Sequence, residues 1–239
     1  MSRLKFISVS VVGLFACLSS ALSWPHVRGG ELPSTVEQKV GPIKLENEYL
    51  VDGLAKLNMQ TQGVGFAIEF LPGTPNSPPP PDPRFTTEKD AGTLGKALDW
   101  LCDLDPRYTW KLQGRTINII PRDRFAEPTY LFNRRLSGLT FVDLTNADDS
   151  LEKIFKPIVK PSESVISLSS AGSFAKPWTA TFEDITVRDA LNRVAENLGA
   201  GHGWMVYGND ETRIIDFYAL LLTKAEADKR RKQNGIASP

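Results

Sequence analysis

The amino-acid sequence predicts an α+β fold of two tandem βαββαββ units, each a small mixed sheet packed with two helices. Residues 93–104 carry apolar side chains at positions i, i+3, i+4, i+7 and i+8, the spacing of a helix with one buried face. The same spacing returns 93 positions later, since Leu94 opens the first series and Val187 the second. Strand-like and hairpin-like stretches surround both series in the same order. The sequence therefore indicates a duplicated unit.

The first unit is expected over residues 40–121. Ile43 and Leu45 alternate with polar residues, which is typical of a half-buried strand, and Asn47 follows as a candidate N-cap. In chain order we expect a strand at 43–46, a helix after Asn47, strands at 64–70 and 85–87, a helix at 94–104, and a hairpin at 108–112 and 116–120.

The second unit is expected over residues 138–219. Asn146 lies 99 positions after Asn47 and is again a candidate N-cap, while Thr186 with Asp189 three residues later resembles a capping box. In chain order we expect a strand at 142–145, a helix that Pro157 ends, strands at 165–168 and 179–182, a helix that ends at Gly199, and a hairpin at 204–207 and 212–217.

Four segments are expected to lie outside these units. They are a flexible lead-in at 24–39, a proline-rich loop at 72–84, a connector at 122–137 and a charged tail at 220–239, whose residues 220–222 could extend the last strand. The loop contains four consecutive prolines, which favour an extended polyproline II conformation. One hypothesis makes them a docking handle for a partner, and the alternative makes the loop a stiff surface excursion. The prolines are Pro78, Pro79, Pro80 and Pro81.

The first 23 residues are typical of a secretory signal peptide, because two basic residues precede an almost uncharged apolar run from 6 to 22. One interpretation places cleavage after residue 23. The other places a lipidated Cys17 at the mature N-terminus, because residues 14–17 resemble a lipoprotein signal. We therefore expect export to the periplasm or outer membrane of a bacterium, or secretion, with membrane contact only through a lipid anchor.

Charge and cysteine content narrow the classes of partner and of chemistry. The chain has 28 basic and 28 acidic side chains, so no overall field attracts nucleic acid. With Cys17 removed or acylated, Cys102 is the remaining thiol and cannot form an internal disulfide. Cys102 lies on the apolar stripe of its helix, which favours a small buried side chain over a reactive thiol.

No arrangement typical of a catalytic or cofactor site stands out, so we expect no enzymatic activity, metal or cofactor. The two histidines are His26 and His202, each in a loop-like segment. His202 could act as a base toward Ser169 or Ser170, but nothing in the sequence brings these residues together. The pairs Asp148-Asp149 and Asp103 with Asp105 are explained by helix capping and turn formation.

The element order, with the phrases TLGKALDWLCDLDPRYTWKLQGRTINIIP and ITVRDALNRVAENLGAGHGWMVYGNDETRIIDF, resembles the secretin and TonB short N-terminal domain. In that family a Thr-Leu-x-x-Ala-Leu helix start precedes an aromatic hairpin that closes in an Ile/Val-rich strand. The first copy carries this start at residues 93–98, and the second carries it at 186–191 with Val in place of Leu. The resemblance covers about 40–121 and 138–219.

The resemblance implies a periplasmic protein-docking module, here a stand-alone exported protein. We expect a non-enzymatic interaction module that binds another envelope protein, as an accessory to a secretion, pilus or TonB-type system, through sheet edges or the groove between the two units. Two alternatives stay open. One is a cell-wall or periplasmic hydrolase with an unrecognised site, and the other is a structural subunit of an envelope assembly.

Overall fold

The computed structural model describes residues 35–73, 81–167, 173–209 and 211–221 and confirms the α+β class. The first half contains β1 (Ile43–Glu48), α1 (Leu50–Gln60), β2 (Gly65–Glu69), β3 (Phe85–Lys89), α2 (Leu94–Leu104), β4 (Tyr108–Gln113) and β5 (Thr116–Pro121). The second half contains β6 (Arg135–Asn146), α3 (Ala147–Phe155), β7 (Ser164–Ser167), β8 (Ser173–Thr186), α4 (Val187–Leu198), β9 (Gly203–Gly208) and β10 (Thr212–Tyr218). The order of helices and strands is the same in both halves.

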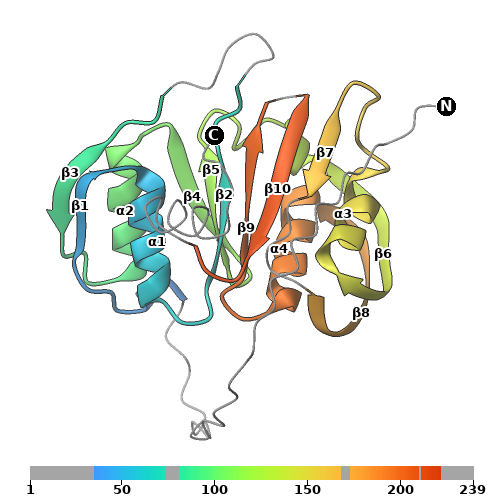
Figure 1. Ribbon diagram of the computed structural model, residues 1–239, viewed down its shortest axis with the longest axis horizontal. Coiled ribbons are helices and arrows are strands. Elements are labelled where there is room, and N and C mark those ends of the chain that lie inside the picture. The colour runs from blue at the N-terminus through green and yellow to red at the C-terminus, as the bar shows by residue number, and fades with distance from the viewer. Residues whose placement is uncertain (1–34, 74–80, 168–172, 210, 222–239) are drawn as a thin grey trace, which may run out of the picture.

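The strands are distributed differently from the two separate mixed sheets that the sequence suggests. Both halves share one six-stranded sheet of order β4-β5-β2-β9-β10-β7. β2 and β9 join the halves in parallel, with Ala67 opposite Trp204 and Glu69 opposite Val206. The remaining strands form two antiparallel ribbons, β1 with β3 and β6 with β8. Each helix pair packs between a ribbon and the shared sheet (Figure 1).

The two helix pairs cover opposite faces of the shared sheet. β5 runs parallel to β2, and β2 runs parallel to β9, whereas β10 runs antiparallel to β9. Corresponding strands of the two halves therefore run in opposite directions. The second half is thus rotated relative to the first, so that its helices lie on the opposite face of the shared sheet. In β2, Phe66 and Ile68 pack in the core beside α1 and α2, whereas Ala67 packs in the core beside α3 and α4. Figure 1 accordingly shows the helix pairs on the two sides of the sheet.

Both apolar stripes that the sequence predicts are buried. The buried side chains of α2 are Leu94, Ala97, Leu98, Leu101 and Cys102, and those of α4 include Val187, Ala190, Leu191, Val194 and Ala195. Burial of these side chains supplies the main stabilisation of each half. Among the described residues, no helix is long and apolar enough to span a membrane.

The first strand of each half contains a bulge at a residue with positive φ. Asn47 has φ +56° and Asp143 has φ +48°, a backbone region that Asn and Asp tolerate better than most residues. The backbone N–H of Asn47 donates to Thr86 Oγ1 at 3.0 Å, and that of Asp143 donates to Thr179 Oγ1 at 3.0 Å. The prediction that Asn47 caps α1 is wrong, because the bulge carries β1 on to Glu48.

The caps differ between the halves. α1 begins after Tyr49, whose backbone N–H donates to the Asp52 carboxylate at 2.9 Å. Asn146 and Thr186 are caps as predicted, since their side chains accept from the backbone N–H groups of Asp149 and Asp189.

Other element boundaries differ from the prediction. β6 begins at Arg135, inside the expected connector, and β8 runs from 173 to 186. Because the bulge at Asp143 shifts the alternation, Phe141 and Leu144 are buried while Val142 is 58% exposed. β10 ends at Tyr218, and Leu221 packs into the core of the first half instead of extending the strand.

Candidate functional site

The outer edge of β4 offers backbone hydrogen-bonding groups. Gln113 and Thr116 pair across a two-residue turn with Gly114 at φ +61°, as in a type II′ hairpin, where the flanking residues bond each other. Because bonded and non-bonded pairs alternate along an antiparallel ladder, Trp110 and Leu112 direct their N–H and C=O groups away from β5. No other strand of the described residues pairs with this edge.

One outward group of β4 is already engaged. The C=O of Tyr108 accepts from Nη2 of Arg122 at 3.0 Å, which limits the open part of the edge to residues 110–112. The side chain of Lys111, the one charged residue of β4, is exposed on the sheet face. A lysine on an edge strand is a common protection against indiscriminate pairing.

In the second half, the strand that corresponds to β4 has another strand paired with its outer edge. β9 is the first strand of its hairpin, as β4 is, and β2 covers its outer side in parallel. The backbone N–H of Phe70 donates to Val206 O at 3.0 Å, and that of Gly73 donates to Gly208 O at 3.0 Å. The chain thus contains one example of a strand added to this position of the repeated unit.

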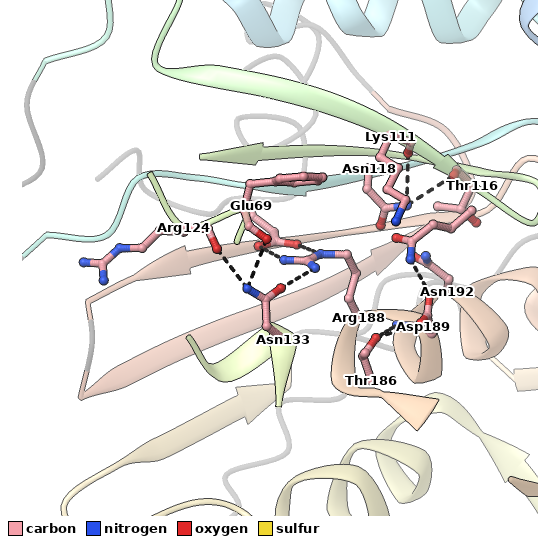
Figure 2. A network of polar contacts seen from close by, with 12 residues as sticks. Glu69, Lys111, Thr116, Asn118, Arg124, Asn133, Thr186, Arg188, Asp189 and Asn192 are labelled. Carbon is pink, nitrogen blue, oxygen red and sulfur yellow. Dashed lines mark hydrogen bonds and ion pairs between the residues drawn. The ribbon is translucent and has the colours of Figure 1, made fainter. Parts of the chain in front are cut away.

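A buried ion pair links the two halves where β2 of the first half meets α4 of the second. We call this boundary the seam. Nε and Nη2 of Arg188 on α4 donate to the two carboxylate oxygens of Glu69 on β2 at 2.5 and 3.1 Å. Nη1 of Arg188 donates to Asn133 Oδ1 at 2.6 Å, and Nδ2 of Asn133 donates to the backbone oxygens of Arg124 and Glu127 (Figure 2). The network therefore links both halves and the segment that connects them.

Burial shifts the ionisation of a neighbour of this pair. Tyr130 lies beside Glu69 and is 5% exposed. Its pKa is raised well above the ordinary value, first by desolvation and then by the negative charge of Glu69. Tyr130 therefore stays neutral at physiological pH.

A cavity of about 540 Å³ lies along the same seam and opens to solvent. Its walls come from the β4–β5 turn, from β8 and from one side of α4. The lining residues are Gln113, Gly114, residues 181–185, Asp189, Asn192, Arg193 and Glu196. Gln113 Nε2 donates to Asp189 Oδ1 at 2.7 Å across the cavity. This is the groove between the two units to which the sequence directs the search for a binding site.

The structure places few of the predicted site residues. Cys17 and Pro78, Pro79 and Pro80 lie outside the described residues, and Pro81 is exposed at the end of its loop. Ser169 and Ser170 also lie outside the described residues. In the described ranges, no group of three His, Cys, Asp or Glu side chains is arranged to hold a metal ion.

His202 lies beside a small recess. The recess has a volume of about 30 Å³ and is also lined by Arg115 and Glu196. This is close to the volume of one water molecule. The Nδ1 atom of His202 is buried and has no hydrogen-bond partner among the described residues.

Cys102 and Asp105 serve the fold. Cys102 is 5% exposed, and desolvation raises the pKa of its thiol to about 12, so the thiolate is disfavoured at neutral pH. Asp105 is 2% exposed and accepts from Nε and Nη2 of Arg107 at 2.8 and 2.7 Å. These contacts agree with the buried and turn-forming roles inferred from the sequence.

Sequence reasoning missed the seam residues, although signals for them exist. Thr116 and Asn118 alternate with Ile117 and Ile119 in a strand whose two faces are both buried, so one face of β5 carries two buried polar residues. Arg188 and Asn192 are buried polar residues of α4, beside its apolar stripe. Buried polar residues of this kind need partners and therefore mark a polar seam.

No protein-family model matches this chain, and neither curated proteins nor solved structures show a significant match.

Proposed function

We propose that this chain is an exported, non-enzymatic protein-interaction module of the bacterial envelope, an accessory to a secretion, pilus or TonB-type system. Its partner is an extended segment of another envelope protein, added as a strand to the outer edge of β4. The observation that supports this function is the β2–β9 junction, where the counterpart of β4 accepts a parallel strand. The signal-like N-terminus and the family resemblance support the location.

The chemistry of the edge restricts the partner. The N–H and C=O groups of Trp110 and Leu112 favour an extended backbone of about three or four residues, comparable to the short β2–β9 ladder. Lys111 is exposed beside them and favours an acidic side chain in the added strand. We therefore expect a partner segment that is extended, parallel to β4 and acidic.

The test removes one outward N–H group without shortening a ladder. Leu112→Pro deletes the N–H of Leu112, which proline tolerates where that group faces away from the neighbouring strand. Leu112→Ala is the matched control, because it truncates the same half-buried side chain and keeps the N–H. Both variants and the wild type are crosslinked in cells, purified and compared for bound envelope proteins, with circular dichroism as the check of folding.

We expect a specific partner with the wild type and with Leu112→Ala, and its loss with folded Leu112→Pro. The same partners at the same yield with all three proteins would contradict docking at β4.

The same junction favours a second function, a structural subunit of an envelope assembly. β7 occupies in the second half the place that β2 has in the first, since each lies parallel to the second strand of its hairpin. No other strand of the described residues pairs with the outer side of β7. A second copy could thus add its β4 to β7, head to tail, and the operation would repeat. Light scattering across a wide concentration range distinguishes the two functions, because a constant monomeric mass contradicts the assembly alone.

A further inference from the structure

The two halves hold the tryptophan of their hairpins in the same way. Trp110 Nε1 donates to Asp99 Oδ1 of α2 at 2.8 Å, and Trp204 Nε1 donates to Asn192 Oδ1 of α4 at 2.8 Å. Asp99 is the sixth residue of α2, and Asn192 is the sixth residue of α4. β4 and β9 therefore stand in the same relation to their helices, so the strand added to β9 shows what a strand added to β4 would contact.

The apolar side chains along these two strands differ in burial. β2 covers the outer side of β9, where it places Ala67 opposite Trp204, and Trp204 and Val206 are 0% and 3% exposed. Their counterparts Trp110 and Leu112 pack against the core of the first half but are only partly buried. A strand on the outer edge of β4 would remove apolar surface of both side chains from water, which favours docking there.

The residue of the added strand opposite Trp110 is expected to be small. In the second half this position belongs to Ala67, which is 0% exposed and packs in the same core as Trp204. Neighbouring strands lie about 4.8 Å apart, so opposite side chains on one face of a sheet compete for the same space. Because the bond to Asp99 fixes the indole ring of Trp110, a large side chain opposite it would be crowded.

The residue opposite Leu112 is expected to be apolar, in contrast to the corresponding residue of β2. That residue is Glu69, which lies opposite Val206 and whose carboxylate accepts from Arg188 in the first turn of α4. The residue of α2 that corresponds to Arg188 is Gly95, because each is the second residue of its helix. Glycine offers no counter-charge, so a carboxylate buried there would be costly, whereas an apolar side chain gains contact with Leu112.

Two charged side chains of α2 lead to the same choice. Asp99 is bonded to Trp110 and would repel a carboxylate on the α2 side of the added strand. Lys96 is exposed and corresponds to Asp189, which accepts from Gln113 on β4, two strands beyond β2. The α2 side of the edge therefore favours uncharged residues in the added strand.

We propose that the strand added to β4 carries the three-residue pattern small, acidic, apolar, with these residues opposite Trp110, Lys111 and Leu112 in that order. The acidic residue follows from Lys111, which is exposed on the other face of the sheet. The pattern rests on the docking at β4 proposed above and specifies the segment that binds there. An extended stretch such as Ala-Glu-Val, parallel to β4, has this pattern.

The test uses the full mature chain labelled with ¹⁵N and four pentapeptides with blocked ends. One is Thr-Ala-Glu-Val-Thr, and the others replace its Ala by Leu, its Glu by Lys or its Val by Glu. The backbone N–H groups of Trp110 and Leu112 and the indole N–H of Trp110 report on the edge. We expect Thr-Ala-Glu-Val-Thr to shift these resonances in a saturable manner at millimolar concentrations, and each changed peptide to bind about three-fold more weakly or worse.

Lys111→Glu should reverse the charge preference of the edge. The side chain of Lys111 is exposed, so the substitution leaves the pairing of β4 with β5 in place. We expect the wild type to prefer the peptide with Glu about three-fold over the peptide with Lys, and the variant to prefer the peptide with Lys by a similar factor. Lys153→Glu is the matched control, because it changes an exposed lysine on α3 in the other half, and it should keep the wild-type preference.

The outcomes separate the pattern from the docking itself. Saturable shifts of Trp110 and Leu112 that are equal for all four peptides would overturn the pattern and still support docking at β4. An unchanged preference in Lys111→Glu would overturn the acidic position. If no peptide shifted these resonances, docking at β4 would be contradicted together with the pattern.

Discussion

Arg188 and Glu69 form a two-pronged ion pair across the seam, with Nε to Oε1 at 2.5 Å and Nη2 to Oε2 at 3.1 Å. Glu69 ends β2 in the first half and Arg188 lies in the first turn of α4 in the second, and their side chains are 0% and 7% exposed. The pair therefore holds together two halves that also share one sheet. Its contribution is best measured by removing one partner at a time.

Glu69→Gln should destabilise the protein by about 3 kcal/mol, because it leaves the Arg188 charge buried without its counter-charge. The free energy of unfolding from urea titration measures the effect. The double variant Glu69→Leu with Arg188→Met should recover most of the loss, since an apolar pair needs no desolvation of charge. If Glu69→Gln lowered the free energy of unfolding by less than about 1 kcal/mol, the pair would behave as a solvent-exposed ion pair and would not stabilise the seam as a buried one.

Thr186→Ala should cost about 1 kcal/mol, because the Thr186 hydroxyl accepts from the backbone N–H of Asp189 at 3.1 Å and caps α4. Thr93 holds the corresponding place before α2 but makes no side-chain cap bond, so Thr93→Ala should cost much less. Chemical denaturation of the two variants gives the comparison. Equal losses would contradict the assignment of only one of these threonines as a cap.

Cys102 should make stability depend on alkaline pH. The folded thiol has a pKa of about 12, above the ordinary value of 9.0, because burial disfavours the thiolate. Above pH 9 the unfolded chain loses this proton while the folded chain keeps it, so stability falls as pH rises from 9 toward 12. Between pH 8 and pH 10 the wild type should lose about 1 kcal/mol more than Cys102→Ala in urea unfolding. Parallel pH profiles of the two proteins would contradict a buried thiol.

The bulges of the two halves should respond alike to substitution. Asn47→Ala and Asp143→Ala should each cost about 1 kcal/mol, because alanine is strained at φ +56° and +48°. Glycine at either position adopts these angles freely and should cost less than alanine. Thermal unfolding of the four variants makes the comparison. Equal stability of the Ala and Gly variants at either site would show that no left-handed residue is needed there.

Much of the fold follows from local patterns. The stripe that begins at Leu94 and the stripe that begins at Val187 define α2 and α4, because the helical repeat dictates which side chains share a face. Both hairpins follow from alternating segments around short polar turns. Because these patterns involve only residues close in the sequence, the helices and hairpins can be predicted from the sequence alone.

The features that were missed depend on contacts between distant segments. The pairing of β2 with β9 depends on the second half turning over against the first, and no local pattern encodes it. Asn47 and Asn146 are equivalent in sequence, yet only Asn146 caps a helix, because the bond to Thr86 draws Asn47 into a bulge. The seam cavity is lined by residues of both halves. The sequence alone therefore does not show which residues face the polar side chains of β5.

Amide hydrogen exchange in the purified protein distinguishes an open outer edge of β4 from the covered outer edge of its counterpart β9. The N–H groups of Trp110 and Leu112 should exchange orders of magnitude faster than those of Trp204 and Val206, because within the described part of the chain β9 has a strand on its outer side and β4 has none. Equal protection of Leu112 and Val206 would show that the edge of β4 is already covered, and it would contradict docking there.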